Sequence, residues 1–98
     1  MNILRIRRTR KAEDDVLDIW NYVALDSIAA ADAVVRRIDE VVSLLAAYPH
    51  LGAPQDRFRS GLRCMGVGNY LILYDHSADV LRILRVLHGA RRWQGLIG

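Results

Sequence analysis

The sequence has a single cysteine, Cys64, which excludes a disulfide within the chain and is typical of a cytoplasmic protein. It has no apolar run long enough to cross a bilayer, and the basic start of the chain shows no signal-peptide pattern. The histidines His50, His76 and His88 are scattered, without the paired spacing of a zinc site. We therefore expect no metal, no cofactor and no membrane partner.

The sequence is also poor in lysine, since Lys11 is the only one among 14 basic residues. Arginine suits planar pairing with carboxylate or phosphate, so an acidic protein segment or a nucleic acid is a candidate partner, although a GC-rich genome also favours arginine. Twelve of the 14 basic residues form three clusters: Arg5, Arg7, Arg8, Arg10 and Lys11; Arg57, Arg59 and Arg63; Arg82, Arg85, Arg91 and Arg92. A length of 98 residues with 52% hydrophobic residues predicts one globular domain, residues 1–98.

Hydrophobic periodicity predicts a strand followed by two helices. Residues 2–8 alternate as in a strand, with charge on one face that places it near a sheet edge. Residues 11–25 carry the stripe of an amphipathic helix, in which Trp20 is expected in the core and Tyr22 at a rim or partner groove. Ser27 caps a second helix over residues 28–47, and the short connection predicts an antiparallel helical hairpin. The acids near the start of the first helix are expected to complement its dipole: Glu13, Asp14, Asp15 and Asp18.

The second half of the chain predicts three strands after a loop. Residues 49–61 hold both prolines and are expected to be irregular. The predicted strands are residues 62–67, 69–75 and 79–88, with "GVGNY" read as a turn or bulge and not as a phosphate-binding loop. The order β-α-α-β-β-β predicts an α+β fold, a small antiparallel-rich sheet that carries the helical hairpin on one face.

Four stretches stand out along the chain: "DIWNY", "YPHLG", "RCMGVGNYLILY" and "VLHGARRW". In this order they span nearly the whole chain, and together they resemble the ParE toxins of the RelE/ParE superfamily. The resemblance implies a RelE/ParE-like fold and the toxin half of a bacterial type II toxin–antitoxin system, of the kind linked to plasmid stabilization. It implies a ParD-like ribbon-helix-helix antitoxin in a heterotetramer or larger complex, DNA gyrase as target, and contact with DNA only through the antitoxin.

The same superfamily implies an alternative function, since RelE-like relatives are ribosome-dependent mRNA endoribonucleases. That reaction needs a base, an acid and cations at the phosphate. Arg63, Arg91 and Arg92 could supply cations, but "RWQGLIG" after Arg91 has no tyrosine or histidine. Only His88 could substitute, and a hydrogen bond that fixes the strand end is its simpler role. We therefore favour a binding toxin that is not an enzyme, with no catalytic residues.

Two sets of residues are predicted to contact other proteins. The tail combines cationic and aromatic groups of the kinds enriched at interface hot spots, so the predicted target-binding residues are Arg91, Arg92 and Trp93. The alternative for Trp93 is that it packs on the sheet and closes the core. The predicted antitoxin-binding residues are Arg57, Arg59, Arg63, Arg85 and Tyr22. The alternative for these arginines is pairing with local acids such as Asp56.

Overall fold

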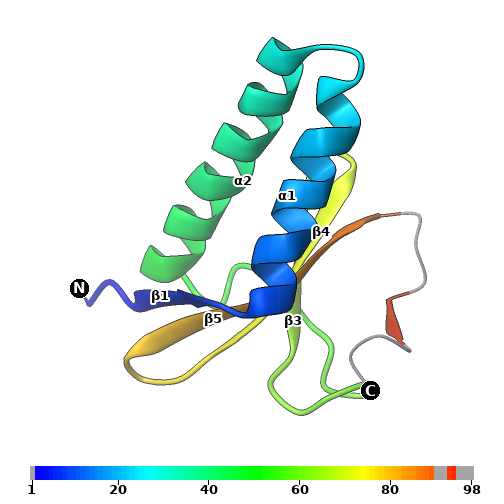
Figure 1. Ribbon diagram of the computed structural model, residues 1–98. Coiled ribbons are helices and arrows are strands. Elements are labelled where there is room, and N and C mark those ends of the chain that lie inside the picture. Colours follow the sequence, from blue (N-terminus) through cyan, green and yellow to red (C-terminus); the bar gives the residue numbers. More distant parts are fainter. Residues whose placement is uncertain (1, 90–92, 95–98) are drawn as a thin grey trace.

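The computed structural model describes residues 2–89 and 93–94, and within them the chain forms two helices and a five-stranded mixed sheet (Figure 1). The elements are β1 (Arg5–Arg8), α1 (Arg10–Ala24), α2 (Ile28–Ala47), β2 (Ala53–Pro54), β3 (Arg63–Val67), β4 (Tyr70–His76) and β5 (Val80–His88). The strand order is β1-β5-β4-β3-β2; β1 runs parallel to β5 and every other pairing is antiparallel. The predicted α+β class and the antiparallel-rich sheet are confirmed.

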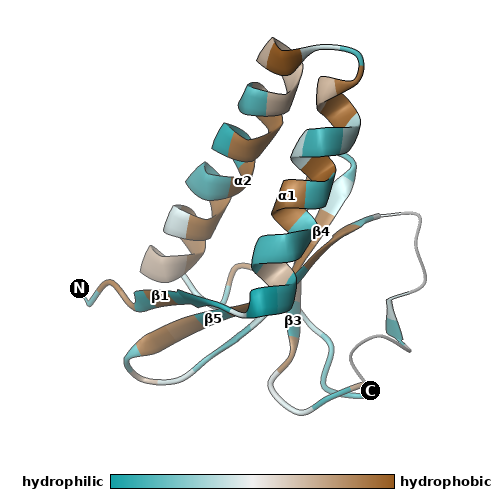
Figure 2. Ribbon diagram, in the orientation of Figure 1, coloured by the Kyte–Doolittle hydropathy of each residue, from teal (hydrophilic) through white to brown (hydrophobic). Residues whose placement is uncertain are grey.

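The helical hairpin packs on one face of the sheet, and its apolar sides face inward (Figures 1 and 2). Thr9 caps α1 by accepting a hydrogen bond from the Ala12 N–H at 3.0 Å, and its hydroxyl donates to the Leu84 carbonyl at 2.8 Å. Ser27 caps α2, as predicted, by accepting from the Ala30 N–H at 3.1 Å. Neither described helix combines the length and the hydropathy that a membrane span requires.

The core between hairpin and sheet is built from side chains of both layers. Its fully buried members include Ile38, Leu45, Ile72, Leu81 and Ile83. Because they come from α2 and from the central strands β4 and β5, the core sits over the middle of the sheet. Each fully buried side chain of this size contributes about 1.5–3 kcal/mol to folding.

Two strand predictions need correction. The first strand begins at Arg5 and not at residue 2, because the Leu4 N–H donates to the Ala46 carbonyl at the end of α2 instead of to a strand. The loop over residues 49–61 contains the short strand β2, in which Ala53 lies opposite Cys64. Pro54 has no N–H to donate, which keeps β2 to two residues. The turn predicted at "GVGNY" is confirmed by Gly68, whose φ is 56°.

The prediction that Trp20 lies in the core is wrong. Its ring is only partly buried, at the seam between the helices. The indole N–H donates to the Asp32 carboxylate of α2 at 2.9 Å. An indole N–H seeks a polar partner when it leaves water, so Trp20 joins α1 to α2 instead of filling the space above the sheet.

Candidate functional site

Trp93 lies on the face of the sheet opposite the hairpin, with 7% of its side chain exposed. It belongs to a second apolar cluster: Leu62, Leu73, Leu84, Leu87 and Trp93. Its ring also meets Phe58 edge-on, with 5.3 Å between the ring centroids. This burial matches the alternative prediction, that Trp93 closes the core, and it leaves little of the ring for a target to contact. Arg91 and Arg92 lie outside the described residues, so their target-binding role stays a prediction.

Arg85 is committed to an ion pair with Asp15 of α1. Its Nε and Nη2 donate to the two carboxylate oxygens at 2.7 and 2.9 Å, and the Val86 N–H donates to the same carboxylate at 3.0 Å. The side chains are 14% and 11% exposed, and the hydrogen bond to Asp15 raises the pKa of Arg85. Arg85 is therefore paired with an acid of its own chain, as in the alternative prediction, although this acid lies 70 residues away in the sequence. Asp15 fastens α1 to β5, a larger role than the predicted complement to the helix dipole.

Arg63 holds the segment between α2 and β2. Its guanidinium donates to the carbonyls of His50 and Gly52, at 3.2 and 2.7 Å. The buried Tyr74 hydroxyl holds the same segment, donating to the Pro49 carbonyl and accepting from the Gly52 N–H, both at 2.8 Å. Burial raises the pKa of Tyr74, against the lowering effects of the Gly52 hydrogen bond and Arg63. Arg63 thus has a structural task that competes with antitoxin binding.

Arg57 and Arg59 are the exposed arginines of the second cluster, on the loop between β2 and β3. Neither takes part in an ion pair among the residues that the structure describes. Arg57 lies over the Phe58 ring, with its Cζ atom 4.8 Å from the centroid. Asp56, the local acid that could have neutralised them, instead accepts a hydrogen bond from the Gly61 N–H at 2.9 Å. These two guanidinium groups are therefore open to a partner.

Tyr22 borders a shallow groove between α1 and the sheet. Its side chain is 75% exposed, and the groove of about 300 Å³ is also lined by Ile19, Tyr70, Val86 and His88. A neighbouring depression of about 290 Å³ runs between α2 and the β3–β4 turn and shares Tyr70. The groove expected beside Tyr22 is present, and Tyr70 is a lining residue that sequence reasoning missed.

The structure does not bring Tyr22 and the exposed arginines together. Tyr22 lies near the tip of the hairpin, whereas the loop with Arg57 and Arg59 lies at the opposite end of the molecule (Figure 1). The predicted antitoxin contacts therefore fall on two surfaces, and a single partner segment must span the domain to touch both.

Two of the groups that RNA cleavage could use, Arg63 and His88, are separated, whereas Arg91 and Arg92 lie outside the described residues. The His88 ring lies beside Tyr70, with 5.8 Å between centroids. Arg63 of β3 lies opposite Tyr74 of β4 in the sheet, four residues along the strand from Tyr70. At the usual rise of a strand, the Cα atoms of Tyr70 and Tyr74 are about 13 Å apart. Burial raises the pKa of the Cys64 thiol, whereas an activated cysteine nucleophile has a lowered pKa. Within the described part of the chain, no three His, Cys, Asp or Glu side chains are placed to hold a metal ion.

The comparisons with known proteins agree with one another. A family model described as the ParE toxin of the type II toxin–antitoxin system parDE matches residues 6–93. The relatives include Toxin ParE1 of Caulobacter vibrioides, 28% identical over 93 residues that cover 94% of this chain and 96% of the relative. Toxin ParE3 of the same organism is 30% identical over 95 residues, covering 96% and 95%.

A solved structure supports the same assignment. The chromosomal ParDE toxin–antitoxin system from P. aeruginosa contains a chain that superposes with a TM-score of 0.74 and 25% sequence identity. The match covers 88% of this chain and 96% of that one, so both the helical hairpin and the sheet have counterparts there.

Proposed function

Since the chain belongs to the ParE toxin family of type II toxin–antitoxin systems, we propose that it acts by binding and inhibiting DNA gyrase in the cytoplasm. The observation that supports binding over RNA cleavage is the separation of Arg63 from His88, because a phosphoryl-transfer site needs cation and acid–base group at one phosphate. On this proposal the protein is not an enzyme, and its effect comes from occupying a surface of its target.

We propose that a ParD-like antitoxin neutralises this toxin in a hetero-oligomer, and that its tail occupies the groove beside Tyr22. The groove has apolar walls from Ile19 and Val86 and runs along a helix, which suits the apolar face of an amphipathic tail helix. The solved neighbour is itself a toxin–antitoxin system, which supports such a partner. Arg57 and Arg59 pair with tail carboxylates at the other end of the domain.

A peptide-binding experiment tests the groove. The isolated antitoxin tail should bind the toxin with one-to-one stoichiometry and gain helicity, as measured by calorimetry and circular dichroism. Tyr22→Ala should weaken binding by about 2 kcal/mol or more if Tyr22 is a hot spot. Tyr48→Ala is the matched control, because Tyr48 is 49% exposed at the end of α2 and does not line the groove. Equal affinities for the two variants would remove the groove from the interface.

A kinetic experiment tests the arginines. Arg59→Glu should slow association with the tail at low salt, and the difference should shrink at high salt as screening takes over. Arg36→Glu on α2 changes the net charge equally and is the control. Arg63 is left intact because its substitution would release the carbonyls of His50 and Gly52. An unchanged association rate for Arg59→Glu at low salt would exclude this loop from the interface.

We propose that Arg91 and Arg92 contact the target. The double substitution Arg91→Gln/Arg92→Gln retains Trp93 and its apolar cluster, so it should keep the melting temperature and antitoxin binding while losing toxicity. A folded double variant that stays fully toxic would refute this role.

Induction in cells separates the two functions of the superfamily. Without antitoxin, we expect DNA-damage signalling and arrested replication, and primer extension on cellular mRNA should show no cuts in phase with codons. Cuts at ribosomal A-sites that Arg91→Ala abolishes would establish the RelE-like ribonuclease instead.

A further inference from the structure

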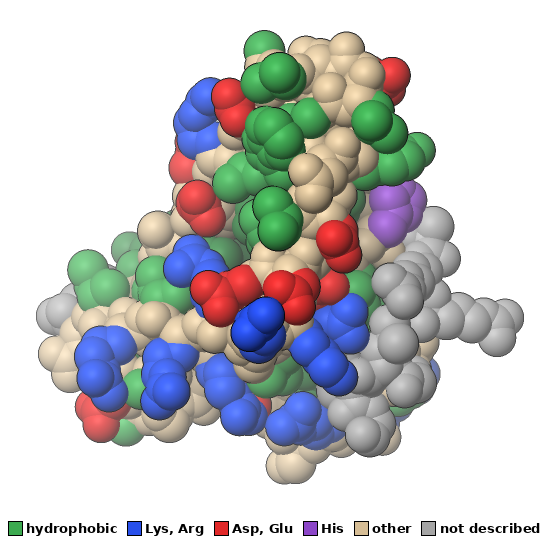
Figure 3. Space-filling view, in the orientation of Figure 1, with side chains coloured by type: hydrophobic (Ala, Val, Ile, Leu, Met, Phe, Trp, Pro, Cys, Tyr) green, Lys and Arg blue, Asp and Glu red, His purple; other side chains and the backbone are tan. Residues whose placement is uncertain are grey.

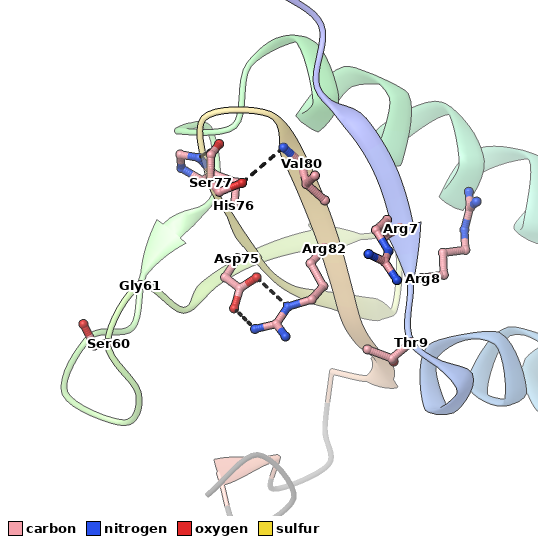
Figure 4. A pocket seen from close by; sticks show the side chains of 10 residues that line it. All are labelled: Arg7, Arg8, Thr9, Ser60, Gly61, Asp75, His76, Ser77, Val80 and Arg82. Atoms are coloured by element: carbon pink, nitrogen blue, oxygen red, sulfur yellow. Dashed lines mark hydrogen bonds and ion pairs between the residues drawn. The ribbon is translucent and has the colours of Figure 1, made fainter.

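The open face of the sheet carries a row of arginines drawn from both ends of the chain. Arg5 and Arg7 of β1 project to the same face because they are two residues apart on a strand. The parallel pairing with β5 places Arg7 opposite Arg82, and Arg82 lies opposite Asp75 of β4. A depression of about 680 Å³ lies on this face. Figure 4 shows Arg7 and Arg82 beside it, and hydroxyl-bearing residues such as Ser77 also line it.

The charge of this face is only partly neutralised. Arg82 is held by Asp75 through two hydrogen bonds, at 2.9 and 2.6 Å. Arg8 also lines the depression, but its guanidinium reaches toward α2 and pairs with Asp39 at 3.4 Å (Figure 4). For Arg5 and Arg7, no ion pair exists among the described residues. Figure 3 shows a row of Lys and Arg side chains below the hairpin.

The lining chemistry distinguishes between two classes of acidic partner. A peptide tail is recognised through apolar pockets for its side chains, but among the described residues that line the depression Val80 is the one hydrophobic side chain, and the others are charged, polar or glycine. A phosphodiester backbone requires only cations and hydrogen-bond donors, which Arg7, Arg82 and the hydroxyl groups of Ser60 and Ser77 supply. Among the described residues, no tyrosine, tryptophan or phenylalanine lines the depression, so these residues offer no platform of that kind on which single-stranded bases could stack.

We propose that this face, centred on Arg5, Arg7 and Arg82, binds the phosphate backbone of duplex nucleic acid without reading its sequence. This goes beyond the gyrase and antitoxin contacts proposed above and departs from the expectation that DNA is met only through the antitoxin. Two unpaired arginines make the contact weak, in the range of roughly 10⁻⁴ to 10⁻⁶ M typical of non-specific binding.

Salt dependence supplies the quantitative expectation. Each neutralised phosphate contributes about 0.9 to the slope of log affinity against log salt for duplex DNA. Two contacts therefore account for about a twelve-fold loss of affinity between roughly 50 and 200 mM salt. Arg5→Gln/Arg7→Gln should bind duplex DNA more weakly than the natural protein and lose this part of the salt dependence.

The test measures fluorescence anisotropy of labelled duplex DNA, duplex RNA and polyglutamate with the purified full-length toxin. Arg36→Gln/Arg37→Gln on α2 removes the same charge and should bind like the natural protein, and circular dichroism checks that both variants are folded. Whichever of duplex DNA and duplex RNA binds more tightly is the nucleic acid whose phosphate backbone this face prefers. Tighter binding of polyglutamate than of either duplex would overturn the proposal, as would equal salt slopes for the two double variants. Gyrase is absent from the assay, so its outcome is independent of the proposed target.

Discussion

Replacing Trp93 by alanine separates a structural role for this residue from a target-binding one. The side chain is 7% exposed and packs in a cluster with Leu62, Leu73, Leu84 and Leu87. Truncating a buried tryptophan costs about 3–5 kcal/mol through lost apolar burial and the cavity left behind. For a domain of this size each kcal/mol lowers the melting temperature by about 4–8 °C, so Trp93→Ala should lower it by roughly 12–40 °C.

Urea unfolding followed by circular dichroism measures the loss directly, with Trp93→Phe and Tyr48→Ala alongside. Trp93→Phe retains an aromatic ring and should lose less stability than Trp93→Ala. Tyr48 is half exposed, so Tyr48→Ala should change the free energy of unfolding by about 0.5 kcal/mol or less. If Trp93→Ala unfolds at the same urea concentration as the natural protein, Trp93 does not close the core, and its predicted contact with the target becomes the better account.

Three further substitutions test the contacts that shape the domain. Asp15→Asn leaves Arg85 with a neutral partner and should lower the free energy of unfolding, measured in urea, by about 3 kcal/mol. Asp14→Asn is the control, because Asp14 pairs with the exposed Arg10, and it should cost under about 1 kcal/mol. Equal losses for the two variants would contradict a structural role for the Asp15–Arg85 pair. Gly52→Ala places a Cβ atom against the Tyr74 hydroxyl and 2.9 Å from the Cys64 carbonyl oxygen, and it should lower the melting temperature. An unchanged melting temperature would show that the segment can shift without cost. Because the folded pKa of Tyr74 is raised, its stabilising effect is fully present below the ordinary pKa of 10.0 and is lost as pH rises through the folded value. As the pH rises above 10.0, the free energy of unfolding should therefore fall less for Tyr74→Phe than for the natural protein. Parallel curves of stability against pH for the two proteins would exclude a contribution from the titration of Tyr74.

The two helices could be predicted from the sequence because their signals are local. The period of apolar residues and the cap at Ser27 set the bounds of α2 at Ile28–Ala47, as predicted. The position of Trp20 could not be predicted from periodicity, which indicates the side of a helix on which a residue lies but not whether a polar partner such as Asp32 lies on the neighbouring helix. Strand β2 could not be predicted because it has only two residues, one of which is the proline Pro54, and they carry no pattern of their own.

The candidate site depended on contacts that are distant in sequence. Asp15 and Arg85 are 70 residues apart, so their pairing becomes visible only when α1 lies on β5. The same holds for Arg7 and Arg82, which the parallel pairing of β1 with β5 brings together. A charge cluster in a sequence therefore predicts where cations are available, but the fold decides which of them are already paired.

The most direct test of the central claim uses purified DNA gyrase and relaxed plasmid DNA. The natural toxin should block supercoiling or trap gyrase-cleaved plasmid, the cognate antitoxin should restore supercoiling, and Arg91→Gln/Arg92→Gln should have little effect. Undiminished supercoiling at a large excess of folded, antitoxin-binding toxin would contradict gyrase as the target.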